Sequence, residues 1–246
     1  MSIMYYTTAT ATDGFGAQYQ RIVETYIYCK MNNLNFLYKP FDNVEHNYKN
    51  DINYVNKLEE LINLKNNIEN INNQNNICHL DYNSRVRSFF EINIDEWCNT
   101  EHMEFIKKCY WSNKDKCRNN NDELSVSVHI RRANLHDRGQ AGSRVTTPNS
   151  YYLNVMNHIR KKYKDKKISF YIFSQGNIDS FRELENVDTK LYLNYDVVET
   201  FKMLVSSDIL VTSPSCFSYV AGLITDGEVY YKNFWHPPKK DWIVMG

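Results

Sequence analysis

The chain alternates short runs of apolar, β-branched and aromatic residues with longer stretches in which apolar positions recur at helical spacing. Residues 3–10 form the first run, and the glycine turn Asp13-Gly-Phe-Gly16 separates them from helical spacing over 19–31. A second apolar run, 35–39, stops before a proline. This order predicts a strand, a helix and a second, parallel strand at the beginning of the chain.

The middle of the chain is more polar. Residues 51–71 begin with helical spacing and then pass into the Asn-rich run 66–76, which is typical of a solvated loop or a frayed helix. A further helix is predicted over 101–117, and it ends in a polar cluster at 113–122. We expect a domain boundary in this cluster, so that the domains are 1–120 and 121–246.

The second half alternates more regularly. Predicted strands are 124–130, 168–173, 190–193, 208–211 and 228–231, and predicted helices are 150–162, 196–205 and 216–224. Strands that alternate with helices at this spacing indicate a parallel sheet covered on both faces, with ligands at the carboxyl ends of its strands. The sequence therefore predicts an α/β fold of two Rossmann-like domains, with the crevice between them as the expected site.

Composition excludes several classes of function. The 246 residues are 42% hydrophobic, and 29 basic side chains balance 29 acidic ones. Without net charge, no overall field attracts nucleic acid or an anionic membrane, so any anion site must be local. No apolar run reaches the roughly 18 residues of a membrane span, and the N-terminus lacks the pattern of a secretory leader. We expect a cytoplasmic protein.

Candidate chemistry begins with the segment Val126-Ser-Val-His-Ile-Arg-Arg132, an apolar strand that ends in His129, Arg131 and Arg132. Neighbouring side chains of a strand point to opposite faces, so one arginine is expected to enter the cleft while the other ties down the loop or contacts a second oxygen. A guanidinium donates several hydrogen bonds in a fixed fork, which suits a diphosphate. Two surface arginines in salt bridges would fit the pattern equally well.

Two other turns have the residue types of an anion site. Thr212-Ser213-Pro214-Ser215 leads into a predicted helix at Cys216, where hydroxyls and backbone N–H groups meet a helix N-terminus. Gly14 and Gly16 follow the first strand and permit a close approach of the backbone to a ligand. An ordinary helix cap and a tight turn are the alternatives.

These segments together resemble a family. His129-Ile-Arg-Arg132 resembles the H-x-R-R segment of the α-1,2-, α-1,6- and protein O-fucosyltransferases. Three further segments resemble the α-1,2-fucosyltransferases in the same order: Gly14-Phe-Gly-Ala-Gln-Tyr-Gln20, Phe170-Tyr-Ile-Phe-Ser174 and Ser207-Asp-Ile-Leu-Val-Thr-Ser-Pro-Ser-Cys-Phe-Ser218. They extend over nearly the whole chain.

The resemblance implies two facing Rossmann-like domains of the GT-B glycosyltransferase type, with the acceptor on the first and a GDP-sugar on the second. It implies inverting transfer of L-fucose from GDP-fucose to a hydroxyl of a glycan acceptor, with no required metal and no other cofactor. The implied donor contacts, in addition to Gly14 and Gly16, are His129, Arg131, Arg132, Ser213 and Ser215, with Asp196 and Glu199 as candidates for the guanine or ribose.

The sequence also departs from the family pattern. Ala133 and Asn134 stand where the family has Gly-Asp or Thr-Asp after the arginines, and Asp137 or His136 is the hypothetical replacement for the missing acid. Asp137 is therefore a candidate catalytic residue, and Asp13, His136 and Glu199 are equally possible as the general base by residue type. The late Trp-Trp-Gly is replaced by Tyr219-Val-Ala-Gly222. A transferase for another nucleotide-linked deoxysugar and a catalytically inactive nucleotide-sugar or glycan-binding module therefore stay open as alternatives.

Overall fold

The computed structural model describes residues 3–71, 76–115, 123–132 and 147–245. The chain divides into two compact units, 1–115 and 116–246. The boundary predicted after residue 120 falls in the segment 116–122, outside the described residues, so its position stays a prediction.

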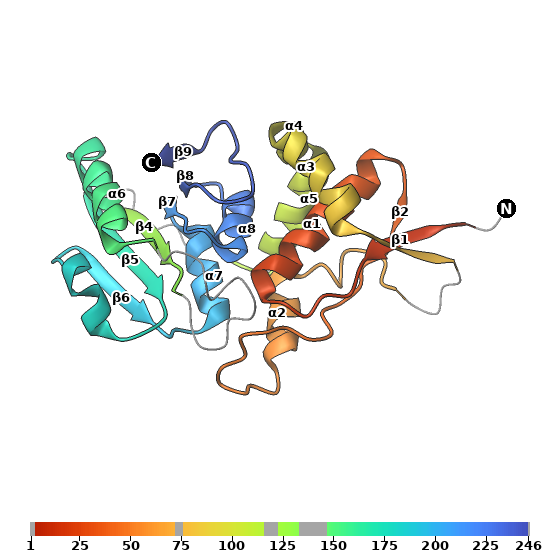
Figure 1. The fold of residues 1–246 in the computed structure, drawn as a ribbon, viewed down its shortest axis with the longest axis horizontal. Coiled ribbons are helices and arrows are strands. Elements are labelled where there is room, and N and C mark those ends of the chain that lie inside the picture. The colour runs from red at the N-terminus through yellow and green to blue at the C-terminus, as the bar shows by residue number, and fades with distance from the viewer. Residues whose placement is uncertain (1–2, 72–75, 116–122, 133–146, 246) are drawn as a thin grey trace. The chain divides into compact units, whose positions relative to one another are not determined.

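The first unit is an α/β layer around a small parallel sheet with the strand order β2-β1-β3 (Figure 1). Its strands are β1 (Tyr5–Thr8), β2 (Asn35–Phe36) and β3 (Ile77–Leu80), and its helices are α1 (Phe15–Met31), α2 (Tyr54–Ile62), the π-helix η1 (Tyr82–Arg87), α3 (Ser88–Ile92), α4 (Ile94–Cys98) and α5 (Glu101–Trp111). The helix predicted over 51–71 is shorter because Asn63 adopts a left-handed conformation, with φ of 52°, and ends it.

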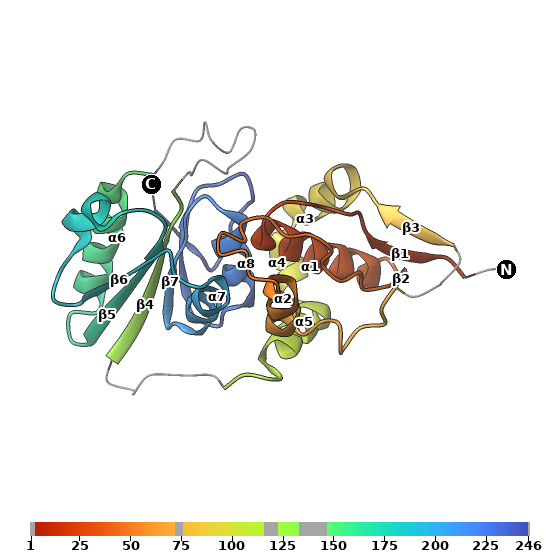
Figure 2. The same cartoon turned by 90° about the horizontal axis from the view of Figure 1, so that it is seen from below.

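The second unit is built on a parallel sheet of six strands in the order β6-β5-β4-β7-β8-β9. The strands are β4 (Glu123–Ile130), β5 (Lys167–Ser174), β6 (Thr189–Leu193), β7 (Ile209–Val211), β8 (Glu228–Lys232) and β9 (Ile243–Met245). The helices are α6 (Asn149–Lys162), the 3₁₀ helix η3 (Ile178–Leu184), α7 (Val197–Ser206) and α8 (Cys216–Ile224). Helix α6 covers one face of the sheet, and α7 and α8 cover the other (Figures 1 and 2).

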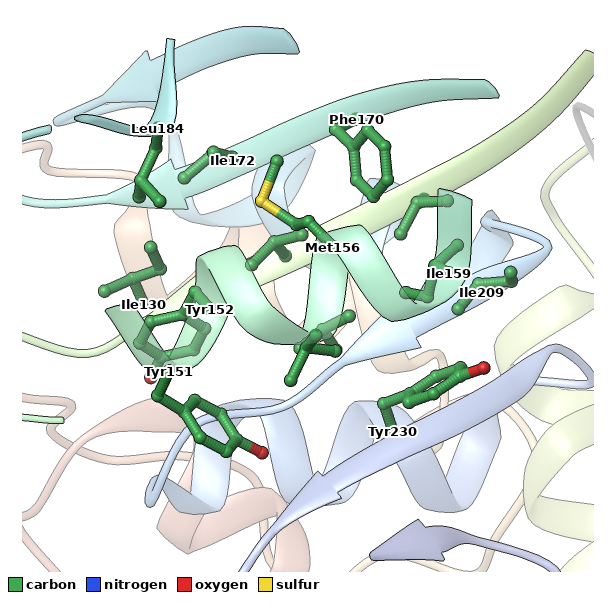
Figure 3. Close-up of a cluster of buried hydrophobic side chains, with 14 of the residues drawn as sticks. Ile130, Tyr151, Tyr152, Met156, Ile159, Phe170, Ile172, Leu184, Ile209 and Tyr230 are labelled. Carbon is green, nitrogen blue, oxygen red and sulfur yellow. The ribbon is translucent and has the colours of Figure 1, made fainter. Parts of the chain in front are cut away.

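The core of the second unit forms where α6 packs on the sheet. Met156 and Ile159 of the helix lie against Phe170 and Ile172 of β5, and all four side chains are buried (Figure 3). Apolar side chains at helical spacing on α6 thus meet strands that are buried on both faces, as is usual in parallel sheets. The predicted α/β fold class, with a parallel sheet in each half, is confirmed.

A buried carboxyl group lies in the core of the first unit. Glu24 of α1 accepts hydrogen bonds from the Gln20 amide and from the Tyr82 hydroxyl of η1, both at 2.7 Å. Burial raises the pKa of Glu24 to about 7, although these two hydrogen bonds oppose the shift. The side chain therefore joins α1 to η1 as a carboxyl group that gains and loses its proton near neutral pH.

This raised pKa predicts that the first unit is more stable in mild acid. Between pH 4.5 and 7 the folded state retains a proton that the unfolded state has lost, so the stabilisation is complete below pH 4.5 and is lost as the pH rises through 7. The shift corresponds to about 3 kcal/mol. We expect Glu24→Gln to lack this stabilisation, so that its free energy of unfolding falls relative to that of the wild type as the pH is lowered from 8 to 5 in urea unfolding.

The matched control for that experiment is Glu60→Gln, because Glu60 is an exposed side chain on α2 of the same unit. The control should follow the wild-type pH profile. Parallel profiles for Glu24→Gln and the wild type would contradict the raised pKa.

Candidate functional site

The strand order of the second unit reverses between β4 and β7. Strands β5 and β6 follow on one side of β4, and β7, β8 and β9 lie on the other. In open parallel sheets, ligands bind beyond the carboxyl ends of the strands at such a reversal. The predicted arginines leave the end of β4 and the predicted serine turn leaves the end of β7, so the fold brings both segments to this point.

A buried polar link connects the two segments. The Nδ1 atom of His129 lies 2.8 Å from the Ser213 Oγ, and the Ser218 hydroxyl donates to the Ser213 carbonyl at 3.2 Å. The Phe217 ring closes over the imidazole, with the ring centres 5.3 Å apart. The sequence predicts that His129 and Ser213 contact the GDP-sugar. In the structure their side chains hydrogen bond to each other inside the second unit and fix the serine turn relative to β4.

Burial, and to a smaller extent the nearby positive charge of Arg131, lowers the pKa of His129 to about 3. The imidazole is therefore neutral at physiological pH. A neutral ring has one N–H donor and one acceptor nitrogen, so it can hydrogen bond to a serine hydroxyl without bringing a second charge to the arginines.

Arg132 anchors the segment that leads into α6. Its Nη1 donates to the Thr147 carbonyl at 2.9 Å, its Nη2 donates to the Asn149 side chain, and the guanidinium lies over the Phe181 ring at 5.2 Å. Burial lowers the pKa of Arg132, but a guanidinium stays charged at physiological pH. Within the described residues this half-buried cation has no carboxylate ion-pair partner, which argues against the surface salt bridge as the reason for its presence.

Arg131 points to different partners. Its Nη1 donates to the Gln175 side chain at 3.3 Å and to the carbonyl of Arg132. Gln175 follows β5, so the guanidinium spans the ends of two adjacent strands. The partners Gln175, Thr147 and Asn149 were not predicted, because uncharged polar side chains far apart in the sequence give no signal of their pairing.

The loops at this edge are fixed by short-range contacts. The Ser174 hydroxyl donates to the Ile130 carbonyl at 2.8 Å. Gly176, with φ of +120°, and Asn194 exchange hydrogen bonds of 3.1 and 3.0 Å between the ends of β5 and β6. A side chain at position 176 would be strained in this conformation. The edge is thus organised before any ligand arrives.

Helix α8 begins at this edge. Ser215 caps it and accepts a hydrogen bond from the Phe217 N–H at 3.3 Å. Tyr152 of α6 is buried with its hydroxyl near the side chains of Thr147 and Ser213, and burial raises the pKa of Tyr152 to about 12. The first-turn N–H groups and the positive end of the helix dipole favour an anion here.

Asp196 and Glu199, which are predicted to contact the guanine or ribose, have partners close by in the sequence. Asp196 caps α7 and accepts from the N–H groups of Val198 and Glu199 at 2.9 and 3.0 Å. Glu199 is half-exposed and pairs with Lys202 at 2.8 Å. Their contact with guanine or ribose stays a prediction.

In the first unit, Gly14 precedes α1, and a Cβ there would lie 2.7 Å from the His46 ring, so close packing against His46 already requires glycine. Gly16 is buried in the first turn of the helix. The predicted ligand contact of both glycines stays a prediction. Asp137, like Ala133, Asn134 and His136, lies outside the described residues.

The described part of the second unit therefore presents two arginines, serine hydroxyls and a helix N-terminus at one reversal of strand order. Hydrogen-bond donors and positive charge dominate this edge, which suits an anion with several oxygens. No group of three or more His, Cys, Asp or Glu residues that could hold a metal ion occurs in the described ranges. No helix of the described chain is long and apolar enough to cross a membrane.

The fold and this edge define an α/β protein of two parallel-sheet units with a candidate anion site in the second unit. No protein-family model matches the sequence, and a search of curated proteins found no match. Among solved structures, the chain is similar to fucosyltransferases crystallised with GDP.

The NodZ α-1,6-fucosyltransferase with GDP is 12% identical, with a TM-score of 0.43 over 92% of this chain and 93% of that chain. POFUT1 with GDP is 10% identical, with a TM-score of 0.44 over 92% and 95%. An arginine-to-lysine mutant of Arabidopsis thaliana FUT1 with GDP is 10% identical, with a TM-score of 0.42 over 98% and 72%. At such low identity and TM-score, the argument for function rests on the residues of this chain.

Proposed function

We propose that this chain is an inverting glycosyltransferase that moves L-fucose from GDP-fucose to a hydroxyl of a glycan acceptor. The second unit holds the donor and the first unit holds the acceptor. The half-buried cation of Arg132 carries the proposal, because within the described residues it has no carboxylate partner and lies where the strand order reverses. The resemblance of His129-Ile-Arg-Arg132 to the H-x-R-R segment supplies the identity of the donor.

The mechanism that follows is electrostatic. The donor diphosphate lies between Arg131 and the beginning of α8, where Ser215 and first-turn N–H groups face it. Negative charge grows on the diphosphate as its bond to the sugar breaks, so donors already in place there stabilise the transition state more than the ground state. The acceptor hydroxyl attacks the opposite face of the anomeric carbon, which inverts its configuration. Asp137 is the candidate base for that hydroxyl.

Nucleotide-dependent stabilisation tests the donor site. A nucleotide at a hundred times its dissociation constant stabilises the fold that binds it by about 2.7 kcal/mol. We expect GDP and GDP-fucose to raise the melting temperature, and UDP and dTDP at equal concentration to leave it within error. If none of the nucleotides raised the melting temperature, the proposal would be contradicted. A larger shift with UDP or dTDP than with GDP would assign the sugar donor to another nucleotide class.

Turnover separates an enzyme from a binding module. The assay is release of GDP from GDP-fucose in the presence of a panel of glycan acceptors, with a chelator present because the proposal requires no metal. Acceptor-dependent release supports the transferase. Binding of GDP-fucose without release of GDP over the whole panel would favour the inactive nucleotide-sugar-binding module. That alternative is motivated by Asn134, which stands where the family pattern has an aspartate.

A further inference from the structure

The first unit contains a hollow at the carboxyl ends of β1 and β2. Residues 8–11 and 39–42 line it together with Gln18, Arg21 and Ile22 of α1. The hollow is partly open, and its empty volume of about 350 Å³ includes open solvent. A hollow of this size cannot enclose a ligand, so it suits contact with one face or edge of a single ring rather than a whole nucleotide.

The charges around the hollow are balanced. Arg21 makes a paired salt bridge with Asp13, with one contact of 2.7 Å between Nη1 and Oδ1. The remaining charged side chains of the lining are Lys39 and Asp42, one of each sign. A phosphate or sulfate site needs an excess of positive charge, so this balance favours an uncharged polar ligand.

The hollow presents both donors and acceptors. The Lys39 ammonium carries three N–H donors, one of which goes to the Thr10 hydroxyl. The Asp42 carboxylate is acceptor-only, and the described part of the chain gives it no hydrogen bond or ion pair. Ile22, Pro40 and Phe41 supply apolar surface between these groups. Neighbouring hydroxyls on a ring with an apolar C–H face match this combination.

Buried contacts hold the walls in place. Glu59 of α2 accepts from the Phe41 N–H at 2.7 Å and from the Tyr38 hydroxyl at 2.9 Å, which fixes the segment after β2. The Gln18 amide donates to the carbonyls of Asp13 and Asn43 at 2.6 and 2.8 Å and so joins the segments on either side. A site that is already organised loses less entropy when it binds a weak ligand.

We propose that this hollow binds one uncharged sugar unit, with Asp42 accepting from its hydroxyls and Lys39 donating to them. This inference rests on the proposed function in one respect, namely that the sugar belongs to the acceptor glycan. The binding of a sugar unit by the first unit is a property of the hollow alone, and it can be tested without transfer.

The test is saturation-transfer NMR of the full chain with methyl glycosides of neutral hexoses and N-acetylhexosamines at up to 50 mM. We expect at least one glycoside to bind, with its affinity lowered tenfold or more in Asp42→Asn and in Lys39→Met. The matched controls are Glu60→Gln and Lys49→Met, exposed side chains of the same unit outside the hollow, which should retain wild-type affinity. Melting temperatures of all four variants verify that each is folded.

Failure of this inference is distinguishable from failure of the proposed function. GDP stabilisation should be the same in Asp42→Asn, Lys39→Met and the wild type, because the donor is proposed to bind the second unit. Absence of glycoside binding at 50 mM would overturn the sugar site even if GDP still binds. Displacement of a bound glycoside by inorganic phosphate at equal concentration would overturn the uncharged ligand class.

Discussion

Replacing Arg131 by alanine is expected to lower the turnover of GDP-fucose at least a hundredfold. Its guanidinium spans the ends of β4 and β5, with the Gln175 side chain as a weak partner at 3.3 Å. Removal of one hydrogen-bond donor to the charge that develops in the transition state raises the activation barrier by about 2.7 to 4 kcal/mol. The measurement is steady-state kinetics of GDP release, in which kcat should fall more than KM rises.

Two other arginines make this result interpretable. Arg182→Ala removes an exposed guanidinium from η3, whose partner is the exposed Asp179, and should leave turnover unchanged. Arg132→Ala should lower the melting temperature as well as the rate, because the Thr147 carbonyl and the Asn149 side chain lose their donor. Arg131→Lys keeps the positive charge but not the forked N–H donors of the guanidinium, so its rate should lie between those of Arg131→Ala and the wild type. Turnover of Arg131→Ala equal to that of the wild type would remove the arginine mechanism.

The elements of the second unit were largely predictable from sequence. The strand predicted over 124–130 is observed as Glu123–Ile130, and the helix predicted over 150–162 is observed as Asn149–Lys162. Both have strong signals, because the β-branched and apolar residues of the strand alternate with polar ones and the helix on the sheet has a clear apolar stripe.

The elements that were missed have weaker signals. Strand β3 is the four-residue segment Ile77–Leu80 directly after the Asn-rich run, and its burial is only partial. Strand β9 (Ile243–Met245) has three residues at the edge of the sheet. Neither segment is long enough for its own pattern to decide, so pairing with a neighbouring strand determines its conformation.

The candidate site was predictable in its main parts but not in its internal links. Strand ends and residue types indicated Arg131, Arg132 and the serine turn. The sequence did not show that His129 turns inward to Ser213, 84 residues away, since a histidine at a strand end is equally compatible with a ligand contact. Long-range pairing of uncharged polar groups has no periodicity from which it can be predicted.

That inward histidine makes the second unit sensitive to acid. The pKa of His129 is lowered from 6.5 to about 3, so between these values the unfolded state binds a proton that the folded state does not. The contribution of His129 to the free energy of unfolding is complete above pH 6.5 and is lost as the pH falls through 3. The full shift corresponds to about 5 kcal/mol, and the expected slope is about 1.4 kcal/mol per pH unit.

His129→Asn tests this contribution, because an amide can hydrogen bond to Ser213 but does not titrate. We expect the variant to be less stable than the wild type at pH 7.5, where it lacks packing against Phe217, and to gain stability relative to the wild type as the pH falls from 6.5 to 4.5. His158→Asn, on the exposed side of α6, should follow the wild-type profile. Urea unfolding at each pH gives the free energies.

The direction in which stability changes with pH distinguishes the two buried side chains, His129 and Glu24. Over pH 4.5 to 6.5 the His129 contribution rises with pH, whereas the Glu24 contribution falls. The wild-type profile is therefore flatter than either group alone would make it, and each single variant should expose the slope of the other. A His129→Asn profile parallel to the wild type over this range would show that the imidazole is solvated and charged, and the buried link to Ser213 would then be wrong.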